Sequence, residues 1–306
     1  MRALVPTGPE TKTVEFGDVP EPEPKPHELV IAVEALSINR GETFLLADPN
    51  PGWRPGKDIA GTVVAAAGDG TGPRPGTRVV GHPWYSGWAE LAAVPAESVA
   101  VLPETVGAES AAVLPLAGIT ALRLLRRSGL GYGDRALITG ASGGVGHYFV
   151  ELAAAAGVRV TAVTATAERG SRLLELGAEA VVRQAGDAAG QYDAVLESVG
   201  AEVFPQALAK LRAGGLLLQF GQASRVAPVL DFFSFFRGPK QARIEHFDYT
   251  IGERTYGAEL ETLVRLVEQG RLHPEIGFTG DWGQAPDAIA ALRERAVRGN
   301  IALTVK

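Results

Sequence analysis

The first hundred residues of the chain carry short apolar runs that are separated by clusters of Pro and Gly. These runs are rich in β-branched residues and cover residues 29–36, 59–67, 78–81 and 88–94. Short strands between turn signals are typical of all-β folds of the sandwich or barrel type. We therefore expect a compact, barrel-like β domain at the start of the chain.

The middle of the chain shows a different pattern, in which β-like apolar runs alternate with helical ones. The β-like runs cover residues 136–138, 158–165, 180–182, 193–199 and 215–220, and the helical runs cover 145–156 and 168–176. Strands that alternate with helices are typical of a doubly wound parallel sheet. A single helical stretch over residues 109–127 leads into this predicted α/β domain.

The final part of the chain predicts two helices, over residues 257–269 and 285–298, and a strand over 301–305. We expect that last strand to return to the first domain. The predicted division is therefore a β domain over residues 1–114 and 256–306 and an α/β domain over 115–255. A chain of 306 residues that is 46% hydrophobic is long enough to bury two such cores.

A glycine-rich turn, Thr-Gly-Ala-Ser-Gly-Gly-Val-Gly, links the first predicted strand of the α/β domain to its first helix. Glycines let the backbone approach a pyrophosphate, and the free N–H groups and dipole of the helix N-terminus hold its negative charge. The turn therefore predicts a nicotinamide dinucleotide site. Its predicted contacts are Gly140, Ser142, Gly143, Gly144, Val145 and Gly146.

Composition excludes several other classes of protein. The net charge of −6 and the lack of a Lys/Arg cluster disfavour nucleic-acid binding. We find no signal-like start and no apolar run long enough to span a membrane, so we expect a soluble cytoplasmic protein. The chain has no cysteine, and its five histidines lack paired spacing, so we expect no metal site.

Two other interpretations of the glycine turn need weighing. Short-chain dehydrogenases carry such a loop near the start of the chain and use a Tyr-x-x-x-Lys pair, and neither feature is present. Residues 140–144 also spell Gly-x-Ser-x-Gly, the nucleophile turn of α/β-hydrolases, with Ser142 as nucleophile. The base would be His246 or His273, and the acid Asp193 or Asp231. The further glycines up to Gly146 favour the dinucleotide loop.

Four further motifs occur in a fixed order along the chain: residues 35–39 (Ala-Leu-Ser-Ile-Asn), 55–61 (Pro-Gly-Lys-Asp-Ile-Ala-Gly), 87–90 (Gly-Trp-Ala-Glu) and 117–120 (Ala-Gly-Ile-Thr). Together with the glycine turn, this series resembles the medium-chain dehydrogenase/reductase superfamily, specifically its zinc-free quinone oxidoreductase branch. The resemblance spans both ends of the chain. It implies a GroES-like β-barrel catalytic domain beside the Rossmann sheet.

The resemblance also shows which family residues are missing. In zinc-dependent relatives a cysteine precedes the segment around Asn39, a histidine stands at the position of Lys57, and a third ligand stands at the position of Leu116. None of these positions can bind zinc here. Because nothing replaces the metal, alcohol oxidation by Lewis-acid polarisation is not expected.

The end of the second strand of the α/β domain bears on the choice of nicotinamide cofactor. A site for NAD usually places Asp or Glu there, whereas this chain has Thr164 and Thr166, which leave room for a 2′-phosphate. Arg169 falls where the similar NADPH enzymes carry a basic residue, and arginine can bind phosphate with two hydrogen bonds. We expect NADPH, although Glu168 is a complication.

The resemblance implies further roles for individual residues. Cofactor contacts are expected from Thr120, Val199, Gly200, Phe220, Gly221, Arg295 and Asn300. Asn39 is expected to orient the nicotinamide or the substrate, and Tyr85 or His82 to donate a proton or hydrogen bond. The alternative is that residues 81–85 only pack inside the domain.

We therefore expect an NADPH-dependent, zinc-independent reductase of quinones or α,β-unsaturated carbonyls that acts by hydride transfer to a small molecule. The alternatives are a non-catalytic NADPH-binding sensor and the serine hydrolase.

Residues 231–236 include four phenylalanines, too apolar a segment to stay exposed. They line a substrate pocket or, as we prefer, are buried in a homodimer.

Overall fold

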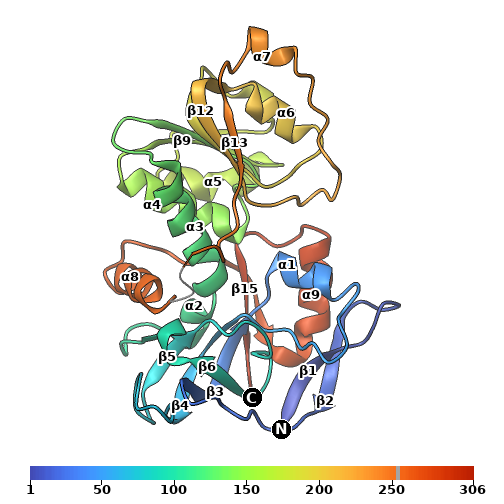
Figure 1. Cartoon of the computed structure of the whole chain (residues 1–306), viewed down its shortest axis with the longest axis vertical. Helices are drawn as coiled ribbons and strands as arrows, with labels where there is room; N and C mark the ends of the chain where they lie inside the picture. The colour runs from blue at the N-terminus through green and yellow to red at the C-terminus, as the bar shows by residue number, and fades with distance from the viewer. Residues whose placement is uncertain (253–255) are drawn as a thin grey trace. The chain divides into compact units, whose positions relative to one another are not determined.

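The computed structural model describes residues 1–252 and 256–306 and divides them into two compact units (Figure 1). Unit 1 consists of Met1–Ile119 and Gly252–Lys306, and unit 2 of Thr120–Ile251. The predicted domain boundary at residue 255 falls outside the described residues. Within the described ranges, no helix is both long and apolar enough to cross a membrane.

Unit 1 is mainly β-structure. Its strands are β1 (Arg2–Pro6), β2 (Val14–Asp18), β3 (Glu28–Ser37), β4 (Asp58–Ala65), β5 (Arg78–Gly81), β6 (Leu91–Pro95), β7 (Val99–Val101), β14 (Ile276–Asp281) and β15 (Asn300–Thr304). Its helices are α1 (Arg40–Leu45), α2 (Ala108–Ala112), α8 (Gly257–Glu268) and α9 (Ala285–Arg293), with 3₁₀ turns at Ala96–Ser98 and Trp282–Gln284.

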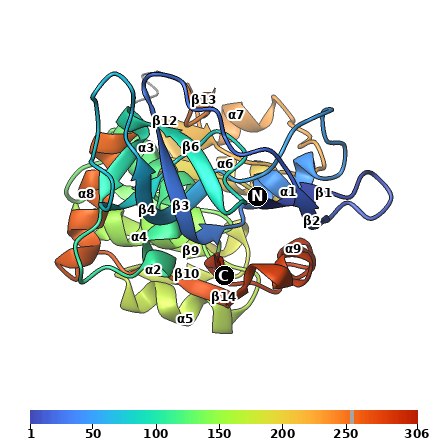
Figure 2. The ribbon, with the colours of Figure 1, turned by 90° about the horizontal axis from the view of Figure 1, so that it is seen from below.

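Strand β3 organises the seven-stranded sheet of unit 1. One edge of β3 pairs with β4 and the other with β6 (Figure 2). The contact with β6 runs through residues 28–32, and on the same edge residues 35–37 pair with β15. Register shifts in the β3–β4 pairing bend the strand, as bulges do. The pairing of β15 confirms that the C-terminal strand returns to the first domain.

Unit 2 holds strands and helices in alternation. Its strands are β8 (Arg135–Ile138), β9 (Arg159–Val163), β10 (Ala180–Val182), β11 (Tyr192–Glu197), β12 (Leu211–Gln219) and β13 (Arg243–His246). Its helices are α4 (Gly144–Ala155), α5 (Ala167–Glu175), α6 (Val203–Leu208) and α7 (Ser234–Arg237), with a 3₁₀ turn at Ala185–Asp187. Helix α3 (Pro115–Ser128) runs from unit 1 into unit 2.

The six strands of unit 2 form one parallel sheet in the order β10-β9-β8-β11-β12-β13. This order confirms the predicted doubly wound Rossmann sheet, because the chain reverses direction across the sheet between β8 and β11. Dinucleotides bind beyond the carboxyl ends of the strands at such a reversal.

Two predicted helices differ from the observed ones. The helix predicted over residues 109–127 is two helices, α2 and α3, because Pro115 has no N–H and starts a new helix instead of continuing the first. The helix predicted over residues 285–298 ends at Arg293. Arg295 follows with a φ of 60°, a left-handed conformation that an α-helix does not contain.

Candidate active site and dinucleotide loop

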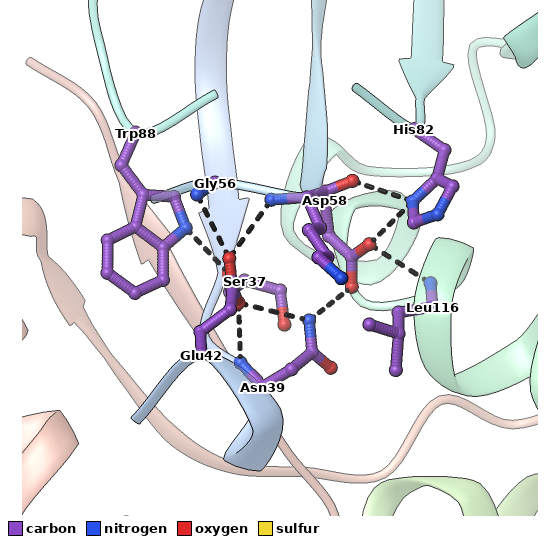
Figure 3. Close-up of polar contacts among 9 residues, drawn as sticks. Ser37, Asn39, Glu42, Gly56, Asp58, His82, Trp88 and Leu116 are labelled. Carbon is purple, nitrogen blue, oxygen red and sulfur yellow. Dashed lines mark hydrogen bonds and ion pairs between the residues drawn. The ribbon is translucent and has the colours of Figure 1, made fainter. Parts of the chain in front are cut away.

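A buried polar cluster occupies unit 1 at the start of β4 and of α1 (Figure 3). Its members are Asn39, Glu42, Asp58 and His82, and all four side chains are buried. The Asp58 carboxylate accepts hydrogen bonds from the Asn39 amide nitrogen at 2.7 Å and from the main-chain N–H of Leu116 at 3.0 Å. Asp58 therefore links α1 to the first turn of α3.

Glu42 uses its carboxylate to hold main-chain N–H groups. Its Oε1 accepts from Gly56 at 2.9 Å and from Lys57 at 3.1 Å, and its Oε2 accepts from the N–H of Asn39 at 3.0 Å. Burial, followed by the negative charge of Asp58, raises the pKa of Glu42 from 4.5 to about 7. Glu42 thus fixes the loop before β4 against the start of α1.

The orientation of His82 follows from its neighbours. Its Nδ1 lies 2.7 Å from the carbonyl oxygen of Lys57 and 3.1 Å from Oδ1 of Asp58. Since both partners accept, Nδ1 carries the proton. The side chain has no exposed surface, and its ring meets that of Tyr256 edge-on at 4.8 Å. His82 therefore lies inside unit 1 rather than on its surface.

The amide of Asn39 is oriented by two carboxylates. Its Nδ2 donates to Asp58 and lies 3.4 Å from Oε2 of Glu42. Because carboxylates accept hydrogen bonds, the nitrogen must face them, and the amide oxygen points away from the cluster (Figure 3). Asn39 thus presents a hydrogen-bond acceptor, which suits an N–H or O–H group of a bound molecule.

In unit 2, the glycine turn joins β8 to α4 as its sequence predicts. Gly140 has a φ of 61°, and a Cβ on Gly146 would lie 2.3 Å from the carbonyl oxygen of Ala141. Helix α4 begins after Gly143, and no described side chain caps it. Its first N–H groups are therefore suited to bind an anion.

Glu197 holds the adjacent loop at the end of β11. Its Oε1 accepts from the N–H groups of Val199 at 2.7 Å and of Gly200 at 3.0 Å, and from the Thr139 hydroxyl at 3.1 Å. Burial raises the pKa of this carboxyl, against the effect of these hydrogen bonds. Glu197 thus places Val199 and Gly200 beside the glycine turn, because Thr139 begins that turn.

The end of β9 leads into α5 through the residues expected to select the cofactor. The Thr164 hydroxyl is buried and donates to the carbonyl oxygen of Thr166 at 2.9 Å. Thr166 caps α5 and accepts from the N–H of Arg169 at 3.3 Å. Arg169 therefore lies in the first turn of α5, where a positive side chain and free N–H groups both favour an anion.

Comparisons with known proteins place the chain in a family. The alcohol dehydrogenase GroES-like domain matches residues 25–104, and the zinc-binding dehydrogenase family matches residues 176–303. The chain is 29% identical to a probable quinone oxidoreductase of Schizosaccharomyces pombe, over 92% of this chain and 90% of that protein. It is 30% identical to the quinone oxidoreductase of Mus musculus, over 70% of each.

A mycobacterial protein solved in complex with NADPH has the same fold, with a TM-score of 0.89 and 27% identity over 99% of this chain and 100% of that one. The chain belongs to the quinone oxidoreductase branch of the medium-chain dehydrogenase/reductase superfamily. The family and the fold expected from the sequence are thereby confirmed.

Other predicted site residues of this family member lie in both units. In unit 2, Phe220 and Gly221 follow β12, next to the loop after β11 in the sheet order, and Thr120 lies on α3. The buried Thr120 hydroxyl has no hydrogen-bond partner among the described residues. Such a group needs a partner from outside the chain, which fits a bound ligand.

The remaining predicted residues belong to unit 1. Asn300 begins β15 and donates its amide to the carbonyl oxygen of Glu275 at 3.1 Å. Arg295 follows α9 on an exposed stretch. The Tyr85 side chain is 58% exposed. The structure therefore joins Asn39 and His82 in one cluster and leaves Tyr85 at the surface of the unit.

Sequence reasoning missed three buried carboxylates: Glu42, Asp58 and Glu197. Asp58 lies in a quoted motif and Glu197 in a predicted strand, yet neither was singled out. The available signal was a charged residue at the end of an apolar strand, as in Tyr-Asp-Ala-Val-Leu-Glu. Charged groups are seldom buried without partners, so such a position suggests a loop-holding role.

Proposed function

We propose that this chain is an NADPH-dependent reductase of quinones or α,β-unsaturated carbonyls that works without zinc. The observation that carries the proposal is the anion-binding set at the carboxyl edge of the unit 2 sheet. It combines the uncapped N-terminus of α4 with Thr164, Thr166 and Arg169 at the start of α5. A dinucleotide with an additional 2′-phosphate carries negative groups suited to both helix termini.

The residues of unit 2 fit this cofactor. The glycine turn lets the main chain approach the pyrophosphate, the loop held by Glu197 borders the turn, and the unpartnered Thr120 hydroxyl offers a further hydrogen bond. When bound, NADPH supplies a hydride to the acceptor. The relatives named as quinone oxidoreductases support a quinone or a similar conjugated carbonyl as that acceptor.

The buried polar cluster of unit 1 offers a fixed group that can orient a bound molecule. The Asn39 amide oxygen, fixed by Asp58 and Glu42, accepts a hydrogen bond from a bound molecule and limits the positions that it can take. His82 holds the main chain of Lys57 instead of contacting solvent. Hydrogen bonds that link Asn39, Glu42, Asp58 and the main chain of Lys57 hold these groups in fixed positions.

Zinc independence rests on the chemistry of the side chains. Lys57 and Leu116 stand where zinc-dependent relatives carry ligands, an ammonium is no ligand for zinc, and leucine has no donor atom. The family name of the match to residues 176–303 mentions zinc, but these side chains do not provide a site for it. Turnover should therefore withstand prolonged treatment with EDTA.

The decisive experiment follows NADPH oxidation by absorbance with a panel of quinones and enones, with NADH and EDTA in parallel. Metal-independent turnover that prefers NADPH supports the proposal. Tight NADPH binding without turnover of any acceptor supports the sensor instead. If NADPH does not bind, the assignment of the glycine turn is wrong.

The serine hydrolase has less support. Among the described residues, no hydrogen bond joins Ser142 to a histidine, and both candidate bases, His246 and His273, are exposed. A hydrolase of this type needs a base within hydrogen-bond reach of its nucleophile. Ester hydrolysis that disappears in Ser142→Ala would contradict our proposal.

We also propose that two copies associate through unit 2. Phe232, Phe233 and Phe236 are 74%, 73% and 75% exposed, and β13 forms an edge of the sheet. Exposed aromatic clusters and open strand edges both favour pairing with another chain. Sedimentation should show a dimer for the wild type and a monomer for the double variant Phe232→Ser/Phe236→Ser; a wild-type monomer at micromolar concentration would contradict this.

A further inference from the structure

Arg183 follows directly after β10, at the carboxyl edge of the unit 2 sheet. Strand β10 runs parallel to β9, with Val182 opposite Val163. One residue after Val163, the N–H of Thr164 donates to the carbonyl oxygen of Val182 at 3.0 Å. The main chain that leads into Arg183 is therefore bonded to the turn of Thr164 and Thr166, which is part of the proposed site for the 2′-phosphate.

Helix α5 lies close against β10 (Figure 2). A Cβ on Gly170 would lie 2.3 Å from Cγ1 of Val181, which is closer than side-chain atoms come, so the helix approaches this valine as closely as glycine allows. Gly170 follows Arg169 directly, and Val181 lies two residues before Arg183. The two arginines are therefore carried by main-chain segments that pack against each other.

Helix α5 alone supplies little positive charge for a phosphate group. Glu168 lies in the same first turn as Arg169, and its negative charge acts against an anion bound there. Arg172, further along the helix, pairs with Glu175 at 2.7 Å and so has a counter-ion of its own. A phosphate monoester carries a charge of about −1.5 to −2 at neutral pH, so it calls for a further cation.

The side chain of Arg183 is available to a ligand. It is exposed, and within residues 1–252 and 256–306 nothing forms an ion pair or a hydrogen bond with its guanidinium group. A guanidinium group offers parallel N–H donors to a phosphate, so two arginines from different elements can hold one phosphate between them. An arginine that follows the strand beside this hydroxyl-bearing turn is thus suited to a phosphate monoester.

We infer, on the basis of the proposed function, that Arg183 binds the 2′-phosphate of NADPH together with Arg169. Unit 2 then recognises this phosphate from β10 as well as from α5, and both contacts are made within one unit. Because NADH carries a hydroxyl in place of the phosphate, Arg183 is a specificity-determining residue for the cofactor.

The test uses two fragments of the cofactor, adenosine 2′,5′-bisphosphate and adenosine 5′-monophosphate, which differ only in the 2′-phosphate. Isothermal titration calorimetry gives the affinity of the full chain for each fragment. We expect the wild type to bind the bisphosphate more tightly, and Arg183→Ala to weaken that binding about tenfold, because a charge-assisted hydrogen bond is lost. The affinity of Arg183→Ala for the monophosphate should equal that of the wild type, which also shows that the variant is folded.

Arg159→Ala is the matched control. Arg159 begins β9 at the amino edge of the sheet, so the substitution removes the same charge from the same pair of strands, away from the turn at Thr164. Its surface ion pair with Glu179 contributes little to stability. The control should bind both fragments like the wild type. The double variant Arg169→Ala/Arg183→Ala should weaken bisphosphate binding more than either single variant does.

Three results would overturn the role of Arg183: a loss of bisphosphate affinity below about threefold in Arg183→Ala; an equal loss for both fragments; or a double variant that binds the bisphosphate as well as Arg169→Ala does. A wild type that binds both fragments equally would refute the NADPH preference of the proposed function, and the role of Arg183 with it. A wild type that prefers the bisphosphate but turns over no quinone or enone would refute the reductase activity and leave the role of Arg183 intact.

Discussion

The two units each contain a buried glutamate that holds a loop by its main-chain N–H groups. In unit 1, Glu42 binds the N–H groups of Gly56 and Lys57 ahead of β4. In unit 2, Glu197 binds those of Val199 and Gly200 after β11. A carboxylate that accepts two adjacent N–H groups fixes the main chain between them, so both units shape a loop in the same way.

The surroundings of the two glutamates differ. Glu42 lies beside a second carboxylate, Asp58, and next to the ammonium-bearing Lys57, whereas the side-chain partner of Glu197 is the uncharged hydroxyl of Thr139. Burial raises the pKa of both, but only in unit 1 does a neighbouring carboxylate add to the effect. The raised pKa makes each loop sensitive to pH, and only the loop of unit 1 also depends on the charge of a neighbouring carboxylate.

The strongest test of the unit 1 cluster is Asp58→Ala. The substitution leaves the N–H of Leu116 buried without its acceptor and weakens the bonds of Asn39 and His82. We expect a loss of about 3 kcal/mol or more in the free energy of unfolding. All four tryptophans, Trp53, Trp84, Trp88 and Trp282, belong to unit 1, so tryptophan fluorescence in a urea titration follows that unit.

Asp58→Asn is the matched control, because its amide oxygen can still accept from Leu116. It should lose less stability than Asp58→Ala. Equal losses in the two variants would show that the charge of Asp58, and not its hydrogen bonds, supports the cluster.

The next effect is the pH dependence that Glu42 gives to unit 1. Its pKa in the folded chain is about 7, above the ordinary value of 4.5, so between these values the folded state binds more protons than the unfolded state. Stability therefore falls as the pH rises from about 4.5 to about 7, by up to about 3 kcal/mol at 1.36 kcal/mol per pKa unit.

The variant Glu42→Gln cannot ionise and should lack this slope. Urea titrations at pH 5 and pH 8, followed by tryptophan fluorescence, give the difference for each protein. Because all other titrating groups are shared, an identical slope in both proteins would rule out the raised pKa of Glu42.

These clusters mark the limit of what the sequence could predict. Local patterns were sufficient for the Rossmann sheet, because each strand and helix has its own periodicity, and β10 lies at the predicted residues 180–182. The break before Pro115 was also readable from the chain, although we expected one helix. Asp58 was not readable, because its partners include Leu116, which is distant in sequence and contributes only its main chain.

Arg169→Ala tests charge at the start of α5, where the hydroxyls of Thr164 and Thr166 hold the turn. If Arg169 binds the 2′-phosphate, its loss removes a charge-assisted hydrogen bond worth about 1.5–3 kcal/mol and weakens NADPH binding about 10- to 100-fold. NADH lacks that phosphate and should bind as before. Arg172→Ala is the control, since Arg172 lies on the same helix and pairs with Glu175. Equal losses for both cofactors would contradict the assignment.

The smallest expected effect is that of Glu197→Gln on NADPH binding. This variant separates the role of Glu197 as a hydrogen-bond acceptor from the role of its negative charge. Glu197→Gln keeps an amide oxygen for the N–H groups of Val199 and Gly200 and loses the 3.2 Å contact between Oε2 and Gly200. We expect the free energy of NADPH binding to weaken by about 1 kcal/mol, which is roughly fivefold in affinity. Fluorescence titration measures the affinity, and Glu197→Ala should lose more of it. If glutamine is as harmful as alanine, the negative charge itself holds the loop, and the contrast with Glu42 disappears.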